Sequence, residues 1–455
     1  MKPFKYLTTL LLTFVAVLCF APAAWAFCGF YVAKADTKLY NKASQVVIAR
    51  DGNRTVLTMA NDYQGDIKDF AVVVPVPTVI QKDQVRVANP KIVERLDAFS
   101  APRLVEYCDP DPCARVYKNE ELQRADAPAA LRSSSGSNRG ESSLGVTVEA
   151  RFNVGEYDIV ILSAKESGGL ETWLNRNGYK IPRGAKQLLQ PYIRSSMKFF
   201  VAKVNLDKFA ENGYQFLRPL QISYQSPKFM LPIRLGMINA TTEQDLIVYI
   251  LSPKGQAEIT NYRTVKIPSD ANIPLFVKQE FGNFYKSMFQ TAYTKEDRKV
   301  AFLEYAWDMS NCDPCSADPL TREELQQAGV FWLDDNRKEP IPPNGFRRPA
   351  PSSNVFITRL HVRYTRDKFP EDLMFQQTNR RESFQGRYVL QHPFTGEANC
   401  QAGKQYKRSL PQRFEQEAQT VAKLTNWNIQ EIRQKMKING QTSTSFWEKF
   451  LSWLL

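Results

Sequence analysis

Histidine is nearly absent from this chain of 455 residues, in which only His361 and His392 occur. A Ser-His-Asp hydrolase needs a single histidine, so this scarcity alone does not exclude that class. However, the chain contains no Gly-x-Ser-x-Gly elbow, His-Glu-x-x-His helix, Walker loop or Gly-x-Gly-x-x-Gly unit. Neither histidine has a recognisable partner string, so we expect both to be structural. The sequence favours a protein that is not an enzyme and indicates no cofactor and no metal ion.

Long apolar runs are also scarce, and the clearest one begins the chain. Lys2 and Lys5 precede an apolar stretch over residues 7–20, and Ala24-Trp25-Ala26 follows it. This order is typical of a signal peptide cleaved after Ala26, and the stretch is short for a membrane span, which needs about 20 apolar residues. An uncleaved N-terminal anchor is the alternative. We therefore expect an exported protein that is periplasmic, bound to the cell envelope or extracellular.

Cysteine is the third scarce residue, with seven in the chain, and Cys19 lies in the predicted signal peptide. The mature protein keeps an even number, which in an oxidising compartment suggests disulfide bonds. The sequence does not choose among the possible pairings. The candidates are Cys28, Cys108, Cys113, Cys312, Cys315 and Cys400.

Two loops rich in Asp and Pro are bounded by cysteines: Cys108 to Cys113, and Cys312-Asp313-Pro314-Cys315. Our first interpretation is that disulfides stabilise these loops. A second is a thiol oxidoreductase motif at Cys312 and Cys315, although Asp313 disfavours a thiolate and the next predicted helix starts only at Thr321. A third is a zinc site with four thiolates, for which the first pair is widely spaced.

Acidic side chains are outnumbered by basic ones, with 47 Asp and Glu against 60 Lys and Arg, which gives a formal net charge of +13. The sequence identifies no partner: we favour a generally basic surface, and weak association with anionic envelope polymers or a membrane surface is the alternative. We expect no specific nucleic-acid binding. Two acidic pairs, Asp62 with Asp66 and Asp109 with Asp111, have the residue type of a calcium site or a glycosidase. Neither follows the EF-hand pattern, and we interpret them as solvated loop residues.

The chain divides into segments of different character. After the signal peptide we predict a β-rich domain over 27–131, a flexible Ser/Gly linker over 132–145, an α+β domain over 146–290, a region of helix and strand over 291–410 and a helical arm over 411–455. In the first domain we expect a hairpin around Asp51-Gly52-Asn53, a buried strand over 70–74 and a helix over 92–99.

Further along the chain the same signals predict strands and helices in alternation. We expect strands over 157–162, 199–204, 220–224, 229–235, 246–251 and 355–364. We expect helices over 167–177, 295–309, 412–424 and 428–438, and one that starts at Thr321, where Glu324 has capping-box spacing. The predicted fold class is therefore α+β, with mostly antiparallel β-rich domains, added helices and a helical C-terminal arm.

The last ten residues form an amphipathic pattern that is too short to span a bilayer. We expect this tail to pack on its own protein; contact with a membrane interface or a partner is the alternative. Its apolar stripe consists of Phe446, Trp447, Phe450, Leu451 and Leu454.

Distinctive strings lie along the chain from Phe27 to about Phe375. They include Phe27-Cys28-Gly29-Phe30-Tyr31, Val72-Val73-Val74-Pro75-Val76-Pro77, Ser100-Ala101-Pro102-Arg103-Leu104, Cys312-Asp313-Pro314-Cys315 and Thr358-Arg359-Leu360. In these strings the chain resembles the bacterial exported proteins of domain-of-unknown-function family 2330. The resemblance implies export or association with the envelope, and it implies no known activity.

These observations lead to one functional expectation and one alternative. We expect an exported, envelope-associated protein with a non-catalytic structural or binding role. The alternative is a periplasmic thiol-disulfide oxidoreductase that uses Cys312 and Cys315.

Overall fold

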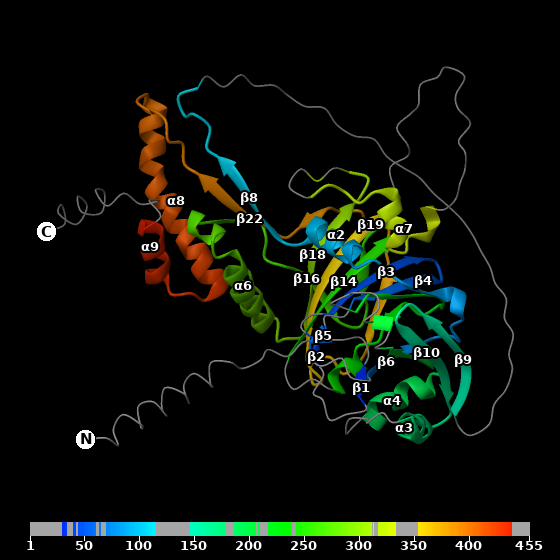
Figure 1. Ribbon diagram of the computed structural model, residues 1–455. Coiled ribbons are helices and arrows are strands. Elements are labelled where there is room, and N and C mark those ends of the chain that lie inside the picture. Colours follow the sequence, from blue (N-terminus) through cyan, green and yellow to red (C-terminus); the bar gives the residue numbers. More distant parts are fainter. Residues whose placement is uncertain are drawn as a thin grey trace, which may run out of the picture.

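The computed structural model describes residues 30–33, 40–41, 44–60, 63–64, 70–114, 146–177, 185–205, 208–209, 217–238, 243–311, 313, 317–333 and 354–438 (Figure 1). The predicted signal peptide, the predicted linker over 132–145 and the aromatic tail lie outside these residues, as do Cys28, Cys312 and Cys315. Within the described part of the chain, no helix combines the length and apolar character that crossing a membrane requires.

The centre of the molecule is a nine-stranded mixed sheet. Its strands are, in order, β16 (Arg263–Lys266), β18 (Val300–Asp308), β19 (Phe356–Tyr364), β14 (Gln244–Ser252), β3 (Ser44–Asp51), β4 (Arg54–Ala60), β12 (Leu220–Gln225) and β7 (Val85–Val87), with β21 (Phe384–Gln385) also paired to β18. The pairs β16–β18 and β14–β3 are parallel, and the other pairs are antiparallel.

A second, five-stranded sheet packs against the first. It is antiparallel throughout, in the order β1 (Phe30–Ala33), β6 (Phe70–Val76), β11 (Lys198–Val204), β10 (Tyr157–Ala164) and β9 (Val146–Val154). One apolar core joins the two sheets, since it contains Val46 and Ile48 from β3 together with Val72 and Phe200 from the second sheet. Alternating side chains of the facing strands fill this layer.

Helices cover the outer face of each sheet. On the five-stranded sheet lie α3 (Ser167–Arg176) and α4 (Ala185–Arg194), and on the nine-stranded sheet lie α2 (Pro90–Ser100) and α7 (Arg322–Gln327). Helix α2 begins at the Asn89 cap, whose side chain accepts a hydrogen bond from the Lys91 N–H. The result is a helix–sheet–sheet–helix arrangement.

A third region lies beside these layers and contains the C-terminal helices (Figure 1, left). It combines the parallel strands β17 (Ala271–Ile273), β22 (Arg387–His392) and β8 (Arg103–Cys108) with α6 (Phe281–Lys295), α8 (Gln401–Thr425) and α9 (Ile429–Ile438). A separate core holds it together, including Phe284 and Met288 of α6 and Phe414 of α8.

Short elements complete the described chain. They are the strands β13 (Met230–Leu231), β20 (Leu373–Gln377), β15 (Ala257–Ile259), β2 (Tyr40–Asn41) and β5 (Tyr63–Gln64), and the 3₁₀ turns η1 (Lys82–Gln84), η2 (Arg234–Ile238), η3 (Leu275–Lys278) and η4 (Phe331–Leu333).

The predicted α+β class is confirmed, and so are several local features. The hairpin β3–β4 turns at Gly52, whose φ of 54° is in the left-handed region that glycine enters freely. The capping box at α7 is present in both directions between Thr321 and Glu324. The strands of the nine-stranded sheet come from all three predicted segments 27–131, 146–290 and 291–410, so these boundaries do not separate packed units.

The helix predicted over 295–309 is wrong, because residues 300–308 form strand β18. Its residues from Val300 to Ala306 are all buried: Ala301 and Leu303 face the core between the sheets, and Phe302 faces the C-terminal core. A strand buried on both faces shows no alternation of polar and apolar residues, so its pattern is easily mistaken for a helix. The strand predicted over 229–235 shortens to β13, followed by the turn η2.

Candidate functional site

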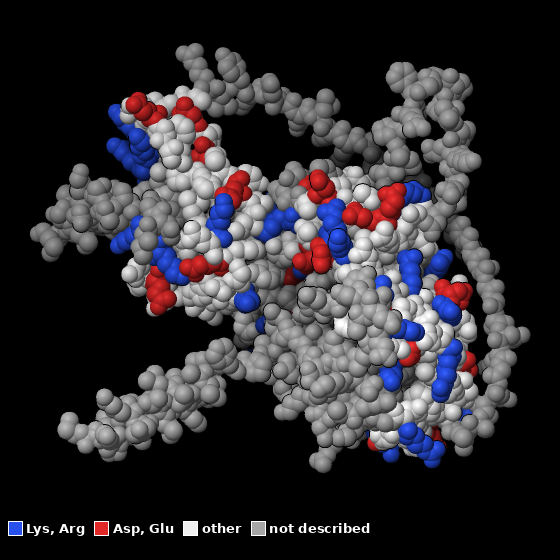
Figure 2. All heavy atoms as spheres, in the orientation of Figure 1, with Lys and Arg blue, Asp and Glu red and all other residues white. Residues whose placement is uncertain are grey.

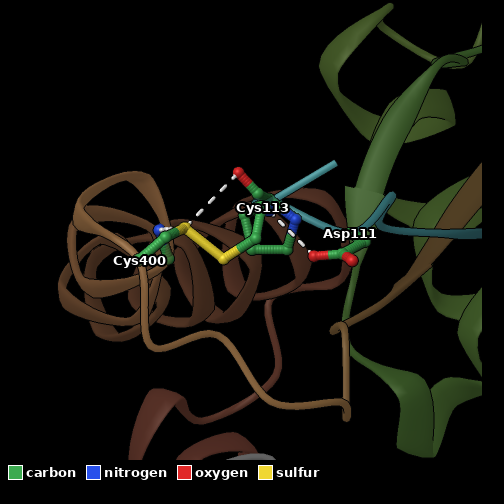
Figure 3. Close-up of a disulfide and its surroundings, with 5 residues drawn as sticks. Asp111, Cys113 and Cys400 are labelled. Atoms are coloured by element: carbon green, nitrogen blue, oxygen red, sulfur yellow. Dashed lines mark hydrogen bonds between the residues drawn. A yellow bond between two sulfur atoms is a disulfide. The ribbon is translucent and has the colours of Figure 1, made fainter. Parts of the chain in front are cut away.

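The structure joins two of the six candidate cysteines. Cys113 and Cys400 form a disulfide with a Cα–Cα distance of 6.0 Å, and it connects the loop after β8 to the start of α8 (Figure 3). Cys108, the last residue of β8, carries an exposed free thiol. The pairing of the remaining candidates, Cys28, Cys312 and Cys315, stays a prediction.

Asp109 attaches the same loop to α8 by polar contacts. Its carboxylate accepts hydrogen bonds from Gln391 Nε2 at 2.7 Å, from Arg413 Nη1 at 2.6 Å and from the Tyr406 hydroxyl. Burial raises the pKa of Asp109, but these hydrogen bonds outweigh it and lower the pKa below its usual value. Asp111 instead accepts a hydrogen bond from the Cys113 N–H at 2.8 Å, so this acidic pair is engaged in holding the loop.

A buried ionic network crosses strands β18, β19 and β14 of the nine-stranded sheet. Arg359, His361 and Arg363 alternate along β19 and therefore share one face of it. His361 lies between two carboxylates: its Nδ1 is 2.7 Å from Glu304 Oε1, and its Nε2 is 3.2 Å from Asp245 Oδ1. Its ring also stacks on Phe289 of α6, with the ring centres 4.0 Å apart.

The two carboxylates decide the charge of His361. Burial lowers the pKa of His361, but Glu304 and Asp245 outweigh burial and raise the pKa above its ordinary value. Burial likewise raises the pKa of Glu304, but His361 and Arg359 lower it to about 2. Two carboxylate acceptors favour a proton on each ring nitrogen, and in that state His361 has no lone pair to act as a general base. A histidine in that state differs from the histidine of a hydrolase triad, which needs a free lone pair.

Arg359 extends the network to α2. Its Nε donates to Glu304 Oε2 at 2.6 Å, and its Nη1 donates to Asp97 Oδ1 at 2.6 Å and to the Tyr249 hydroxyl at 3.2 Å. The Tyr285 hydroxyl of α6 donates to Glu304 Oε1, the oxygen that also pairs with His361 Nδ1. One carboxylate therefore holds together β18, β19 and α6.

A polar cleft of about 430 Å³ opens at the far edge of the nine-stranded sheet, where β12 and β7 face α7 and η4. Its walls carry four glutamine side chains, two arginines and two carboxylates, with the ring of Phe331 at one end. The lining residues are Arg54, Val56, Asp83, Gln84, Val85, Arg86, Gln221, Ser223, Glu323, Gln326, Gln327, Gly329, Val330 and Phe331.

Hydrogen bonds fix part of this cleft in position. Gln221 donates from Nε2 to Thr58 Oγ1 at 2.6 Å and accepts from Arg86 Nε. Gln84 donates to the carbonyl of Ser223 at 3.0 Å, and the Arg54 guanidinium lies 4.2 Å from the centre of the Phe331 ring. The cleft therefore has a preformed polar floor, which favours binding without rearrangement.

The family model for uncharacterized proteins conserved in bacteria (DUF2330) matches residues 22–376, most of the chain. The chain belongs to the DUF2330 family. No curated protein matches it, and no solved structure does.

Most of the site residues lie within the residues that match the DUF2330 model, but some lie beyond them. The cleft, the His361 network, Cys108 and Cys113 lie inside the matched residues, whereas Cys400 and helices α8 and α9 lie beyond them. Strand β22, also beyond the match, is the middle strand between β17 and β8. The fold of this DUF2330 chain thus continues past the matched residues.

Sequence reasoning predicted that both histidines are structural, and it missed the residues that surround His361. The period-two spacing of Arg359, His361 and Arg363 in a predicted strand was the available signal for a charged face. Glu304 lay in the segment predicted as a helix, and Asp245 is over a hundred residues from His361 in the chain. The cleft was not foreseen because its walls come from four separate parts of the chain. Within the described residues, no group of three or more His, Cys, Asp or Glu side chains is placed to hold a metal ion.

Proposed function

We propose that this DUF2330 protein is exported and has a non-catalytic binding role at the cell envelope, with the polar cleft as its ligand site. The observation that carries the proposal is the cleft itself, whose amide, guanidinium, hydroxyl and carboxylate groups supply donors and acceptors side by side. Hydroxyl groups both donate and accept hydrogen bonds, so a chain of sugars suits such a lining better than an apolar ligand.

The net charge narrows the ligand to an anionic polysaccharide of the envelope. The mature chain, which lacks Lys2 and Lys5, keeps a formal net charge of +11 and attracts such polymers over a distance of about 10 Å at moderate salt. On the face drawn in Figure 2, basic and acidic side chains are interspersed over the described surface. Long-range attraction is therefore weak and salt-sensitive, and the cleft supplies the selectivity.

Two features support export. Residues Met1 to Ala26 have the order of a signal peptide, and the Cys113–Cys400 disulfide suits an oxidising compartment. The alternative, an oxidoreductase that uses Cys312 and Cys315, is less favoured. Asp313, which lies between these cysteines in the sequence, is buried and accepts hydrogen bonds from Tyr305 and Gln385. A negative charge next to Cys312 in the sequence disfavours a reactive thiolate.

Cell fractionation tests the export proposal. The full chain should accumulate outside the cytoplasm with a mature N-terminus at Phe27, and deletion of residues 1–26 should retain it in the cytoplasm. Cytoplasmic location of the full chain would contradict export. The same experiment measures partition into membranes, and unchanged partition after deletion of 446–455 would rule out attachment through the tail.

Co-sedimentation with isolated cell-wall sacculi that carry anionic polysaccharide tests the cleft. Arg54→Ala removes a cleft side chain and should weaken binding by about three- to tenfold, equivalent to roughly 1 kcal/mol. Arg176→Ala, on α3, removes the same charge outside the cleft and should change binding little. Equal loss in both variants, or no binding by the wild type, would refute the cleft as the ligand site.

A further inference from the structure

We infer that Cys108, Cys113 and Cys400 form a thiol–disulfide exchange site, in which Cys108 attacks Cys113 and releases Cys400. Three observations lead to this: the disulfide between Cys113 and Cys400, the free exposed thiol of Cys108 in the same loop, and the position of Cys400 at the start of a long helix. The inference does not depend on the polysaccharide cleft or on Cys312 and Cys315.

Cys400 is built as a leaving group. It is the N-cap of the 25-residue helix α8, and its Sγ accepts a hydrogen bond from the Gly403 N–H at 3.2 Å. A helix N-terminus stabilises negative charge, so it favours the thiolate that forms when the disulfide breaks. Glycine is needed at 403, because a Cβ there would lie 2.5 Å from the Ala398 carbonyl oxygen.

Cys113 is the sulfur that receives the attack. The carboxylate of Asp111 accepts a hydrogen bond from the Cys113 N–H at 2.8 Å and lies beside this residue (Figure 3). A neighbouring negative charge disfavours a thiolate on Cys113. Exchange proceeds through the better leaving group, so the bond opens with Cys400 as the thiolate and Cys113 as the electrophile.

Cys108 supplies the nucleophile within the same loop. It is exposed at the end of β8, and only residues 109–112 separate it from Cys113. The Asp109 N–H donates to the His392 carbonyl at 2.9 Å and fixes the start of the loop. A thiol tethered over so few residues has a high effective concentration at its target.

The exchange is balanced without any added oxidant or reductant. Cys108 loses its proton, its sulfur bonds to the Cys113 sulfur, and the Cys113–Cys400 bond breaks. The Cys400 thiolate takes a proton from solvent, so one disulfide and one thiol are present before and after. The contacts of Asp109 with Tyr406 and Arg413 keep α8 near the loop, which makes the exchange reversible.

The consequence is a covalent attachment that can be switched. With Cys113 bonded to Cys400, α8 is tethered covalently to the loop after β8. With Cys113 bonded to Cys108, non-covalent contacts hold the helix, among them those of Asp109 and the hydrogen bond from the Phe394 N–H to the Tyr406 hydroxyl. The choice of disulfide thus sets how tightly α8 is attached: the Cys113–Cys400 bond attaches it more tightly than the Cys108–Cys113 bond.

Alkylation of the oxidised full chain followed by peptide mass spectrometry tests the inference. N-ethylmaleimide is added at pH 8 without reductant, and the peptides of Cys108 and Cys400 are followed with time. In the wild type, Cys400 should become labelled in some molecules while Cys108 appears bonded to Cys113. In Cys108→Ser, labelling of Cys400 should fall by about tenfold or more, because no internal thiol can open the bond.

Ala114→Ser, in the same exposed turn, is the matched control and should behave as the wild type. Far-ultraviolet circular dichroism establishes that each variant is folded. The inference fails if Cys400 stays unlabelled in the wild type or if Cys108→Ser labels Cys400 equally fast. It also fails if mapping finds Cys108 bonded to Cys28, Cys312 or Cys315.

Discussion

At the scale of single residues, the most consequential group is the carboxylate of Glu304. It is 1% exposed and faces two positive charges, Arg359 and His361, within 2.7 Å. A buried ion pair adds little stability compared with an apolar replacement of equal shape, but breaking it leaves an uncompensated charge. Glu304 therefore fixes the position of its partners more than it adds to the total stability.

Glu304→Gln should destabilise the protein by about 3–5 kcal/mol, because it leaves Arg359 and His361 with fewer compensating charges in a buried site. Urea unfolding followed by tryptophan fluorescence measures the change. Glu382→Gln removes an exposed carboxylate that pairs with Lys266 and serves as the control. It should leave the free energy of unfolding nearly unchanged, because water and salt screen an exposed pair. Equal effects of the two variants would contradict the role of Glu304.

His361 makes the same network sensitive to pH. Its pKa is higher in the folded protein than in the unfolded chain, so the stabilisation is complete below about pH 6.5 and is lost as the pH rises through the raised value. Wild-type stability should fall as the pH rises above about 6.5, and the His361→Asn variant should lack that contribution. Unfolding curves from pH 6 to pH 9 measure it. An identical pH slope in both proteins would show that His361 is not charged.

Glu417 differs from an ordinary surface acid because it is buried and its pKa is raised. It is 1% exposed, and neither carboxylate oxygen has a hydrogen-bond partner. Burial raises its pKa to about 7, although Arg413 opposes this. Because the folded pKa exceeds the unfolded value, the folded state prefers the neutral acid, and stability falls as the pH rises from about 4.5 to about 7.

Glu417→Gln should remove this slope and stabilise the protein at pH 8 by about 1–3 kcal/mol. Chemical unfolding at pH 5 and pH 8 measures the difference. Glu415→Gln, on the same helix, is the control: the hydrogen bond from Arg433 lowers the pKa of Glu415, so this variant should lose about 0.5 kcal/mol or less at pH 8. A Glu417→Gln variant that is less stable at pH 8 would contradict the assignment.

At the scale of elements, local signals in the sequence were sufficient where a turn or a cap marks the boundary of the element. The Thr321–Glu324 capping box and the hairpin turn at Gly52 each depend on a few neighbouring residues. The prediction for β18 was wrong because the position of this strand depends on its pairing with β16 and β19, which lie far from it in the sequence. Helix α8 was predicted to start at Gln412, after the breaker Pro411, but it begins at Gln401 and continues through the proline.

The candidate sites were also predicted only in their local parts. The sequence showed which cysteines could form disulfides, but the pairing of Cys113 with Cys400 spans 287 residues and depends on where α8 lies beside β8. The partners of His361 and the walls of the cleft meet only through the order of strands in the nine-stranded sheet. Long-range placement, rather than residue chemistry, was the missing information.

The disulfide should protect the start of α8 specifically. Cys400→Ser removes the tether, and amide hydrogen exchange over residues 401–410 should become faster while residues 414–425, packed in the C-terminal core, change little. Mass spectrometry of exchanged peptides measures both segments. Cys108→Ser cannot open the disulfide and should protect residues 401–410 at least as well as the wild type. Unchanged exchange at 401–410 in Cys400→Ser would show that the polar contacts and packing hold the start of the helix without the disulfide.

At the scale of the whole molecule, the layers are linked by shared strands rather than by flexible joints. The nine-stranded sheet contributes Ala301 and Leu303 to the core between the sheets and Phe302 to the C-terminal core from the same strand, β18. The two cores are therefore continuous through one strand. Loss of either core exposes one face of β18, which makes the folding of the two regions interdependent.

Truncation after residue 376, where the family match ends, should therefore prevent proper folding. It removes β22 from between β17 and β8, and it removes α8 and α9, whose Phe414, Ile432 and Met436 are buried against the C-terminal core. Each such side chain contributes about 1.5–3 kcal/mol, and the total stability of a domain is only about 5–15 kcal/mol. We expect aggregation or strong binding of an apolar dye, measured by gel filtration and fluorescence.

Truncation after residue 438 keeps the whole C-terminal core and should leave unfolding cooperative. A monomeric, cooperatively unfolding fragment ending at 376 would show that the two regions fold independently.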